Sequence, residues 1–501
     1  MRHKALEMKF KVAWLALFLM GITIFSYAQI TLTIEQALDI AEENNPSMRT
    51  SKLSFERTQY LLEASRASLK PQFSMTLDPF AYSQTRSFDN RYSEWYTNKN
   101  LSTNGTFRTE LPILFTDGTL TLSNRFGWQD SESMTQAGTN KNKAFTNNLQ
   151  LRYDQPVFTY KRTQMELERL KFDNENAGIS YALQRLRTEQ SITRQFYAVY
   201  LAKNNLEISR SELENMQLNY DIIAEKVAAQ LSAKEELFQA EVNLANAKSS
   251  VQSTDVSLQN AKDDLKQTLG MPLEEDIDIM VTVEVTPILF QAEKAIQSGL
   301  ASRMELRQRE ISIELADLQM ITTKAINEFK GDISLSIGIA GDNEQFGNIY
   351  NTPTQSPRVS ISFNVPIFDW GQKKARVQAQ KTAQTIANLE YENQRVDIEL
   401  NIRQSVRSLE NLRNQINIAE ITVRNAILTY ELNQIRYREG DLTGMQMGQY
   451  QTQLSSARTS LARAQINYKN EMLNLKILSL YDFENDKPII PVRELSNISI
   501  R

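Results

Sequence analysis

Apolar residues between Gln372 and Glu439 recur by alternating steps of four and three, and no Gly or Pro interrupts this stretch. A period of about 3.5 residues keeps one narrow stripe facing a partner helix, so the stretch predicts one long α-helix with a coiled-coil seam. Residues 438–444 predict a turn with its tip at Gly440, after which the seam returns towards Leu478. The seam positions are Ile398, Ile402, Ser405, Leu409, Leu412, Ile416, Ala419, Val423, Ala426, Tyr430, Asn433 and Tyr437, and then Leu454, Ala457, Leu461, Ala464, Tyr468, Glu471, Leu475 and Leu478.

Another hairpin of the same kind lies earlier in the chain. Residues 161–230 contain no Pro and one Gly, and the direction reverses near Gln230. Every returning seam position from Leu237 to Leu265 falls, 210 residues later, on the seam from Met447 to Leu475. The segment LQLRYDQPVF at 149–158 likewise falls on VSISFNVPIF at 359–368. We therefore predict a tandem duplication of helices, strands and a coiled hairpin.

The remaining patterns place the other elements. Thr33 and Gln36 have the spacing of a capping box that opens a helix, and Pro46 breaks this helix before a second one. Alternation predicts strands at 73–77, 149–157, 333–339 and 359–367, and a hairpin from Thr106 to Trp128 around Asp117 and Gly118. Each chain then has four strands, or six with that hairpin.

These elements give four parts. We expect a signal peptide at 1–28 and a first repeat at 29–285, with helices 33–68, strands 72–158 and a coiled hairpin 160–270. A second repeat follows at 286–480, with helices 289–329, strands 332–368 and a coiled hairpin 371–479, and then a C-terminal tail at 481–501. The first repeat carries about fifty extra residues between its strands.

Composition narrows the function. Four basic residues, an apolar run and a small-residue end predict that residues 1–28 are a secretory signal. Loss of its four Lys/Arg and one Glu changes the net charge from −4 to −7, which argues against a nucleic-acid partner. The chain has no Cys, and its one His lies in the signal. Catalysis would then need paired carboxylates or a Ser/Lys arrangement, whereas the carboxylates are spread over helix surfaces, so we expect no enzyme, metal or cofactor.

The strand pattern alone fits a half-buried soluble sheet as well as a membrane barrel. Export and the lack of an apolar helix favour the barrel. Four to six strands cannot enclose a conducting pore, and lipid does not tolerate an open sheet edge, so several copies would share one barrel.

The chain resembles the TolC-type outer-membrane efflux proteins over essentially its whole mature length. The resemblance is carried by IEQALDIAEENNP at 34–46, VPIFDWG at 365–371, RYREG at 436–440, and Leu269 with Gly270. It implies a fold that is mainly α with membrane β, in which duplicated helical hairpins continue a trimeric β-barrel. It also implies a passive exit duct for efflux or type I secretion in the outer membrane of a Gram-negative bacterium, in contact with outer-membrane lipid. Its partners would be a periplasmic adaptor and an inner-membrane transporter of the RND or ABC type. The alternative is an exported periplasmic coiled-coil adaptor or structural protein.

The resemblance also assigns candidate residues. The helix tips of this family close the periplasmic entrance, and its gate positions fall on Glu236, Tyr437, Gln446 and Gln449, with a hydrogen bond expected from Tyr437 to Glu236. Adaptor docking would involve Leu231, Ser232, Gly440, Leu442 and Thr443, and the strand-to-helix junctions contain Pro156, Pro366, Phe368, Trp370 and Gly371.

Plainer explanations remain for three of these features. Tyr437 also fits packing in the seam, and Glu236 fits a solvated charge. Trp370 is either an interfacial anchor or an ordinary packing residue. The acidic run 274–278 has a calcium-like composition but lacks the ordered spacing of a calcium loop, so a solvated connector is expected.

Overall fold

The computed structural model describes residues 30–90, 93–135, 138–280, 288, 290–439 and 441–489. These residues form two compact units, one of 30–50, 182–302 and 398–489 and the other of 51–181 and 303–397. Each unit takes segments from both sequence repeats. The predicted signal peptide at 1–28, the predicted tip residue Gly440 and the part of the predicted tail from residue 490 lie outside the described residues.

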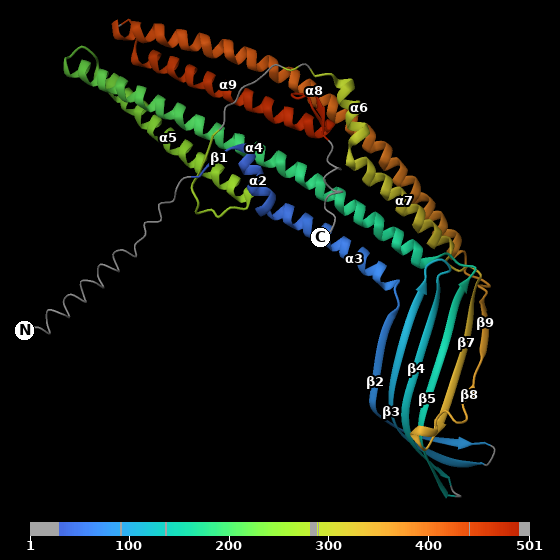
Figure 1. The fold of residues 1–501 in the computed structure, drawn as a ribbon. Coiled ribbons are helices and arrows are strands. Elements are labelled where there is room, and N and C mark those ends of the chain that lie inside the picture. Colours follow the sequence, from blue (N-terminus) through green and yellow to red (C-terminus); the bar gives the residue numbers. More distant parts are fainter. Residues whose placement is uncertain are drawn as a thin grey trace, which may run out of the picture. The chain divides into compact units, whose positions relative to one another are not determined.

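The first unit is mainly helical and contains the predicted hairpins (Figure 1). The hairpin helices are α4 (Arg162–Ala228) with α5 (Lys234–Leu269) and α8 (Gln372–Glu439) with α9 (Gly444–Ser479), of which α4 and α8 begin in the other unit. Adding 210 to the bounds of α5 gives those of α9. No helix among the described residues is both long enough and apolar enough to cross a membrane.

Shorter elements complete this unit. They are β1 (Ile30–Leu32), α2 (Ile34–Asn44), the start of α3 (Pro46–Ser68), β6 (Ile277–Ile279), α6 (Ala292–Ser302), β10 (Tyr481–Asp482) and β11 (Lys487–Pro488). Strands β1 and β6 are parallel, and the predicted capping box of Thr33 and Gln36 begins α2. The core joins α2, α4 and α5 through apolar side chains that include Ala37, Phe196 and Leu265. Leu265 is a predicted seam position, so the predicted seam of α5 faces this core.

Both hairpins reverse direction with the same backbone hydrogen bond. The N–H of Leu231 donates to the carbonyl of Lys226 at 2.8 Å, and the N–H of Asp441 donates to that of Arg436 at 2.9 Å. This six-residue closure satisfies a carbonyl at the helix end. Gln230 adopts a left-handed φ of 65° in the first turn, where glycine is the favoured residue. The duplication therefore extends to individual turn hydrogen bonds.

The second unit contains one antiparallel sheet (Figure 1). Its strands are β2 (Gln72–Asp89), β3 (Glu94–Ile113), β4 (Gly118–Thr135), β5 (Gly138–Val157), β7 (Lys330–Asn343), the short β8 (Thr354–Gln355) and β9 (Arg358–Asn364). Strands β2 to β5 and then β7 pair in order, and both β8 and β9 pair with β7. The 3₁₀ turn η1 (Phe346–Asn348) and helix α7 (Met304–Lys324) also belong to this unit, with parts of α3, α4 and α8.

The sequence predicted either four or six principal strands, and the observed sheet distinguishes between these numbers. The predicted hairpin around Asp117 and Gly118 is present as β3 and β4, with Ile113 opposite Gly118, so the larger number is correct. These two strands are the extra residues of the first repeat. They separate β2 from β5, whereas the corresponding β7 and β9 pair directly. The strands also extend beyond their apolar stretches into segments rich in Ser, Thr and Asn, which the alternation did not reveal.

The two faces of the sheet differ in polarity because side chains alternate along each strand. One row across β2, β3, β4, β5 and β7 consists of Phe73, Thr109, Leu122, Leu151 and Ile337, and the next row on the same face consists of Met75, Phe107, Asn124, Leu149 and Ile339. The opposite face carries Ser74, Arg108, Ser123, Gln150 and Gly338. Many of the apolar side chains are exposed, including Phe73 at 70% and Ile337 at 57%. An exposed apolar surface of this size indicates contact with another protein or with a membrane.

Aromatic contacts border the apolar face at both ends. Phe329 stands between Phe158 and Phe363, with ring centres 5.5 and 5.6 Å away. At the other end, Phe346 contacts Phe126 and Phe145 at 5.5 and 5.9 Å. From Phe145 to Val157, β5 advances about 40 Å at roughly 3.3 Å per residue. With the tilt of about 45° usual for membrane strands, the apolar face would be about 28 Å high, close to a hydrocarbon core.

The junctions between strands and long helices are capped by aspartates. Asp117 accepts hydrogen bonds from the N–H groups of Arg162 and Thr163 at the start of α4. Asp369 accepts from Gly371 and Lys373 at the start of α8. Trp370 is 90% exposed and contacts Phe368 edge to face at 4.8 Å. Of the other junction residues, Pro156 lies in β5 opposite Asp332, and Pro366 follows β9.

Candidate functional site

The free ends of the two hairpins lie in the helical unit and contain most of the predicted gate and docking residues. Thr443 begins α9 with a capping box, in which its N–H donates to the side-chain oxygen of Gln446 at 3.0 Å. Ala233, the corresponding residue before α5, makes no side-chain cap. Gln446, expected at the constriction, therefore stabilises the start of its own helix. Leu231 is exposed, and Ser232 and Leu442 are half-buried.

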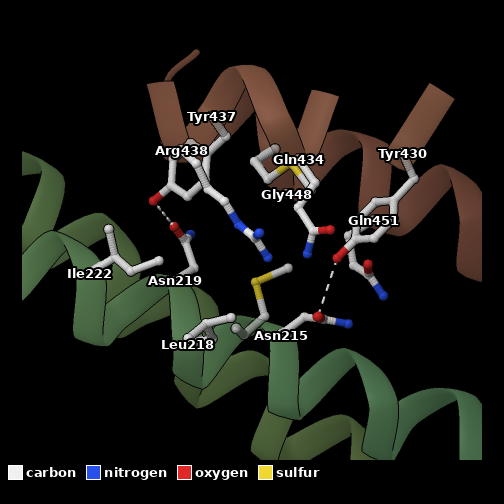
Figure 2. Close-up of a pocket in the computed structure, with 12 residues that line it drawn as sticks. Asn215, Leu218, Asn219, Ile222, Tyr430, Gln434, Tyr437, Arg438, Gly448 and Gln451 are labelled. Atoms are coloured by element: carbon white, nitrogen blue, oxygen red, sulfur yellow. Dashed lines mark hydrogen bonds between the residues drawn. The ribbon is translucent and has the colours of Figure 1, made fainter. Parts of the chain in front are cut away.

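Helix α8 is joined to α4 by two tyrosine–asparagine hydrogen bonds (Figure 2). Tyr437 donates its hydroxyl to Oδ1 of Asn219, and Tyr430, two turns earlier on α8, donates to Oδ1 of Asn215 at 3.2 Å. Tyr437 is 6% exposed and Asn219 is 7% exposed. A neutral hydrogen bond of this kind contributes about 1 kcal/mol to stability. The two bonds therefore orient the hairpins but are weak enough to be broken.

The expected hydrogen bond from Tyr437 to Glu236 is not the one that forms. The hydroxyl of Tyr437 is directed to Asn219, and Glu236 accepts a hydrogen bond from Ser232, four residues earlier. Glu236 still acts on the tyrosine through its charge, because burial and then this carboxylate raise the pKa of Tyr437 above its ordinary value. The ammonium of Lys226 lies 5.4 Å from the centre of the tyrosine ring, within the range of a cation–π contact.

Gly444 allows the start of α9 to lie close to α4. A Cβ placed on Gly444 would lie 2.9 Å from Cδ1 of Ile223 and 3.3 Å from the side chain of Asn219. Gly448, one turn later, lies beside the methyl group of Met216. A larger residue at Gly444 would press on Ile223 and Asn219, so the close approach and the tyrosine–asparagine bonds belong to one packed interface.

Three hollows lie around this interface. A cavity of about 40 Å³ lies between α4, α8 and α9, with Tyr430, Tyr437 and Arg438 on one side and Asn215 and Asn219 on the other (Figure 2). Gln451 also lines it, and its buried Oε1 has no hydrogen-bond partner among the described residues. A groove of about 680 Å³ contains Gln449, and one of about 330 Å³ contains Glu236 and Thr443.

The structure thus brings together only some of the predicted residues. Glu236 and Thr443 share one groove, Gln449 lies in another, and Tyr437 lines the cavity. Asn215, Asn219 and Gly444 were not predicted. The signal that would have indicated Asn219 is an asparagine between Met216 and Tyr220, two residues of the packed face of α4, since a polar side chain on such a face needs a partner.

Comparison with known proteins supports the resemblance. The sequence model of the family described as "Outer membrane efflux protein" matches residues 295–479. A curated relative, described as a probable outer membrane lipoprotein SilC from Salmonella typhimurium, is 20% identical over 260 residues. That match covers 50% of this chain and 55% of the relative, so the chain spans about half the length of this relative.

Solved structures share the fold over most of the chain. The Campylobacter jejuni CmeC outer membrane channel has a TM-score of 0.69 at 14% identity, covering 93% of this chain and 88% of that one. The open state of the Neisseria gonorrhoeae MtrE outer membrane channel has a TM-score of 0.65 at 15% identity, covering 90% of each chain. The Vibrio cholerae outer membrane protein VceC has a TM-score of 0.64 at 14% identity, covering 91% of this chain and 96% of that one. The predicted fold class is confirmed.

Proposed function

Because this chain belongs to the outer membrane efflux protein family and is an outer-membrane protein, we propose that it forms a homotrimeric channel that serves as a passive exit duct. Substances would enter between the hairpin ends and leave through a barrel built from the sheets of three copies. The duct would perform no chemistry, and the choice of substrate would lie with its inner-membrane partner.

The observation that carries this proposal is the sheet with one apolar and one polar face and two open edges. Strand β2 has one partner, β3, and β9 pairs only with β7 among the described residues. An open edge is not tolerated in hydrocarbon, so each edge needs a strand of another copy. The polar face, which carries Arg108, Arg125 and Arg152, would then line the pore.

The helices offer a matching surface for assembly. Exposed apolar residues recur along α8 at coiled-coil spacing, on a stripe separate from the buried seam. In the helical unit this stripe consists of Ile418, Ile421, Leu428, Leu432 and Ile435. Helix α5 exposes Phe238, Val242 and Val256 with the same spacing. We propose that the α8 stripe of one copy packs against the α5 stripe of the next.

The same proposal gives the hairpin ends their role. The bonds from Tyr437 to Asn219 and from Tyr430 to Asn215 would hold the entrance of the duct narrow, and their separation would widen it. The exposed turn residues Leu231 and Thr443, with the half-buried Ser232 and Leu442, would contact a periplasmic adaptor that links the duct to a transporter.

Cysteine cross-linking tests the assembly, because the chain has no cysteine of its own. Cysteines at Phe238 and Leu432 should link neighbouring copies into a trimer in outer-membrane fractions, and the trimer should conduct in planar bilayers. Cysteine at the buried Ile402 is the control that should not cross-link. A polypeptide that remains a water-soluble monomer without detergent would contradict the proposal.

A further inference from the structure

The apolar face of the sheet changes character beyond its aromatic border at Phe126 and Phe145. The next rows on the same face follow from the pairing of β2, β3, β4 and β5. One row consists of Tyr82, Leu101, Asp130 and Lys143, and the following row consists of Gln84, Lys99, Glu132 and Lys141. Arg86 lies one row further along. Charged side chains thus continue the face that would contact lipid.

We name the residues Arg86, Lys99, Asp130, Glu132, Lys141 and Lys143 the outer patch. Its cations outnumber its carboxylates by four to two. Glu132 is shared by two lysines, with Nζ–Oε distances of 3.7 Å to Lys99 and 3.1 Å to Lys141. Asp130 lies 3.3 Å from Lys143. Two carboxylates therefore balance three ammonium groups only in part, and the guanidinium of Arg86 is a further cation.

The exposure of these groups indicates which charges meet a ligand. The side chains of Lys141 and Lys143 are 65% and 63% exposed, whereas those of Glu132 and Asp130 are 22% and 29% exposed. The carboxylates lie closer to the sheet, and the ammonium groups extend beyond them. The surface presented outward is thus positive, although each lysine has an acidic neighbour.

Aromatic residues at the same strand ends suit an interface between lipid and water. Trp95 is 52% exposed, contacts Phe88 edge to face at 5.3 Å, and carries the guanidinium of Arg86 5.0 Å from its ring centre. Tryptophan and arginine together are typical of the level of lipid head groups. These strand ends lie opposite the ends that join α3 and α4.

We propose that the outer patch binds the phosphorylated head group of an outer-leaflet glycolipid, with the phosphates on Lys99, Lys141 and Lys143. This inference rests on the proposed function, in which the apolar face contacts lipid and the helices lie on the periplasmic side. The anionic phosphate matches the excess positive charge, and the aromatic residues place that charge at the boundary of the hydrocarbon. A surface ladder of ion pairs is the alternative, and it predicts the opposite response to loss of the carboxylates.

The test uses the full-length protein purified in detergent and bisphosphorylated lipid A as the probe, with bound lipid counted by native mass spectrometry. The variant K99Q/K141Q/K143Q should bind at least about fivefold less lipid, since one basic residue near an anionic membrane surface changes the binding affinity by about fivefold. The matched control R108Q/R125Q removes cations from the opposite face and should bind like the unchanged protein. Dephosphorylated lipid should bind the unchanged protein as weakly as bisphosphorylated lipid binds the triple variant.

A second variant separates the two explanations. D130N/E132Q removes the carboxylates and should increase binding of the bisphosphorylated lipid, because the lysines lose their competing partners. Unchanged or reduced binding by this variant would overturn the inference, as would equal binding by the triple lysine variant and its control. The trimer on gels and its conductance report on the proposed function separately, so a conducting trimer without lipid specificity refutes only this inference.

Discussion

The side chain of Asn45 donates a hydrogen bond to the backbone carbonyl of Thr268 at 2.6 Å, which ties the junction of α2 and α3 to the end of α5. The same side chain accepts from the N–H of Met48 at 2.9 Å and so begins α3. Asn45 is 6% exposed. One amide thus caps a helix and joins segments more than two hundred residues apart.

Replacement of Asn45 by alanine should therefore lower the stability of the helical unit. Loss of the cap costs about 1 kcal/mol, and the unpaired carbonyl of Thr268 adds a similar amount. Thermal unfolding in detergent, followed by circular dichroism, measures the change. Asn388→Ala is the control, since Asn388 is exposed on α8 and bonds only within its helix. Equal melting temperatures for the two variants would disprove the linking role of Asn45.

Gln230→Gly should stabilise the protein. Gln230 is exposed and holds a φ of 65°, a conformation that costs a residue with a Cβ about 1 kcal/mol and glycine little. Gly270→Ala should have the opposite effect, because Gly270 has a φ of 73° and an added Cβ would lie 2.4 Å from the carbonyl oxygen of Asn44. Thermal unfolding of both variants checks the signs, and a lower melting temperature for Gln230→Gly would contradict this account.

The hydrogen bond between Tyr437 and Asn219 should resist opening of the entrance. Tyr437→Phe and Asn219→Ala should each increase the open fraction of single channels in planar bilayers, and the double variant should add little to either. The expected coupling is about 1 kcal/mol per chain, the contribution of one neutral hydrogen bond. Glu236→Gln is the control, because its carboxylate bonds Ser232 and does not bond the tyrosine. Larger opening in the control than in Asn219→Ala would reverse the assignment.

Asp482 should make the protein sensitive to strong acid. Burial alone would raise the pKa of this carboxyl, but hydrogen bonds from Lys476 and Asn485 outweigh burial and lower the pKa to about 2. A lowered pKa stabilises the folded state above the ordinary value of 3.8, and this stabilisation is lost as the pH falls from about 4 to 2.

The variant Asp482→Asn should accordingly be less stable than the unchanged protein at pH 7, by about 1 to 2 kcal/mol. The difference should shrink between pH 4 and pH 2. Unfolding curves at a series of pH values measure it, with Asp264→Asn, at an exposed position of α5, as the control. A difference that stays constant down to pH 2 would exclude the ion pair with Lys476 as its source.

The sequence by itself determined the lengths of the long helices, the two hairpins and their duplication. These features depend on local and periodic properties: Gly and Pro end helices, and a repeated apolar step selects the buried side. The bounds of α8 therefore agree with the predicted stretch Gln372–Glu439. The predicted hairpin from Thr106 to Trp128 was found for the same reason, since alternation and a turn at Gly118 are local signals.

Only the tertiary structure decided which side chains meet. Tyr437 was recognised as important from the sequence, but its partner is Asn219 and not Glu236, because the partner depends on how far one hairpin is shifted along the other. The polar ends of β2 to β5 were missed for a related reason. Strand pairing there is stabilised by backbone hydrogen bonds to a neighbour and by cross-strand contacts such as those of Lys99 and Glu132, which leave no apolar period in the chain.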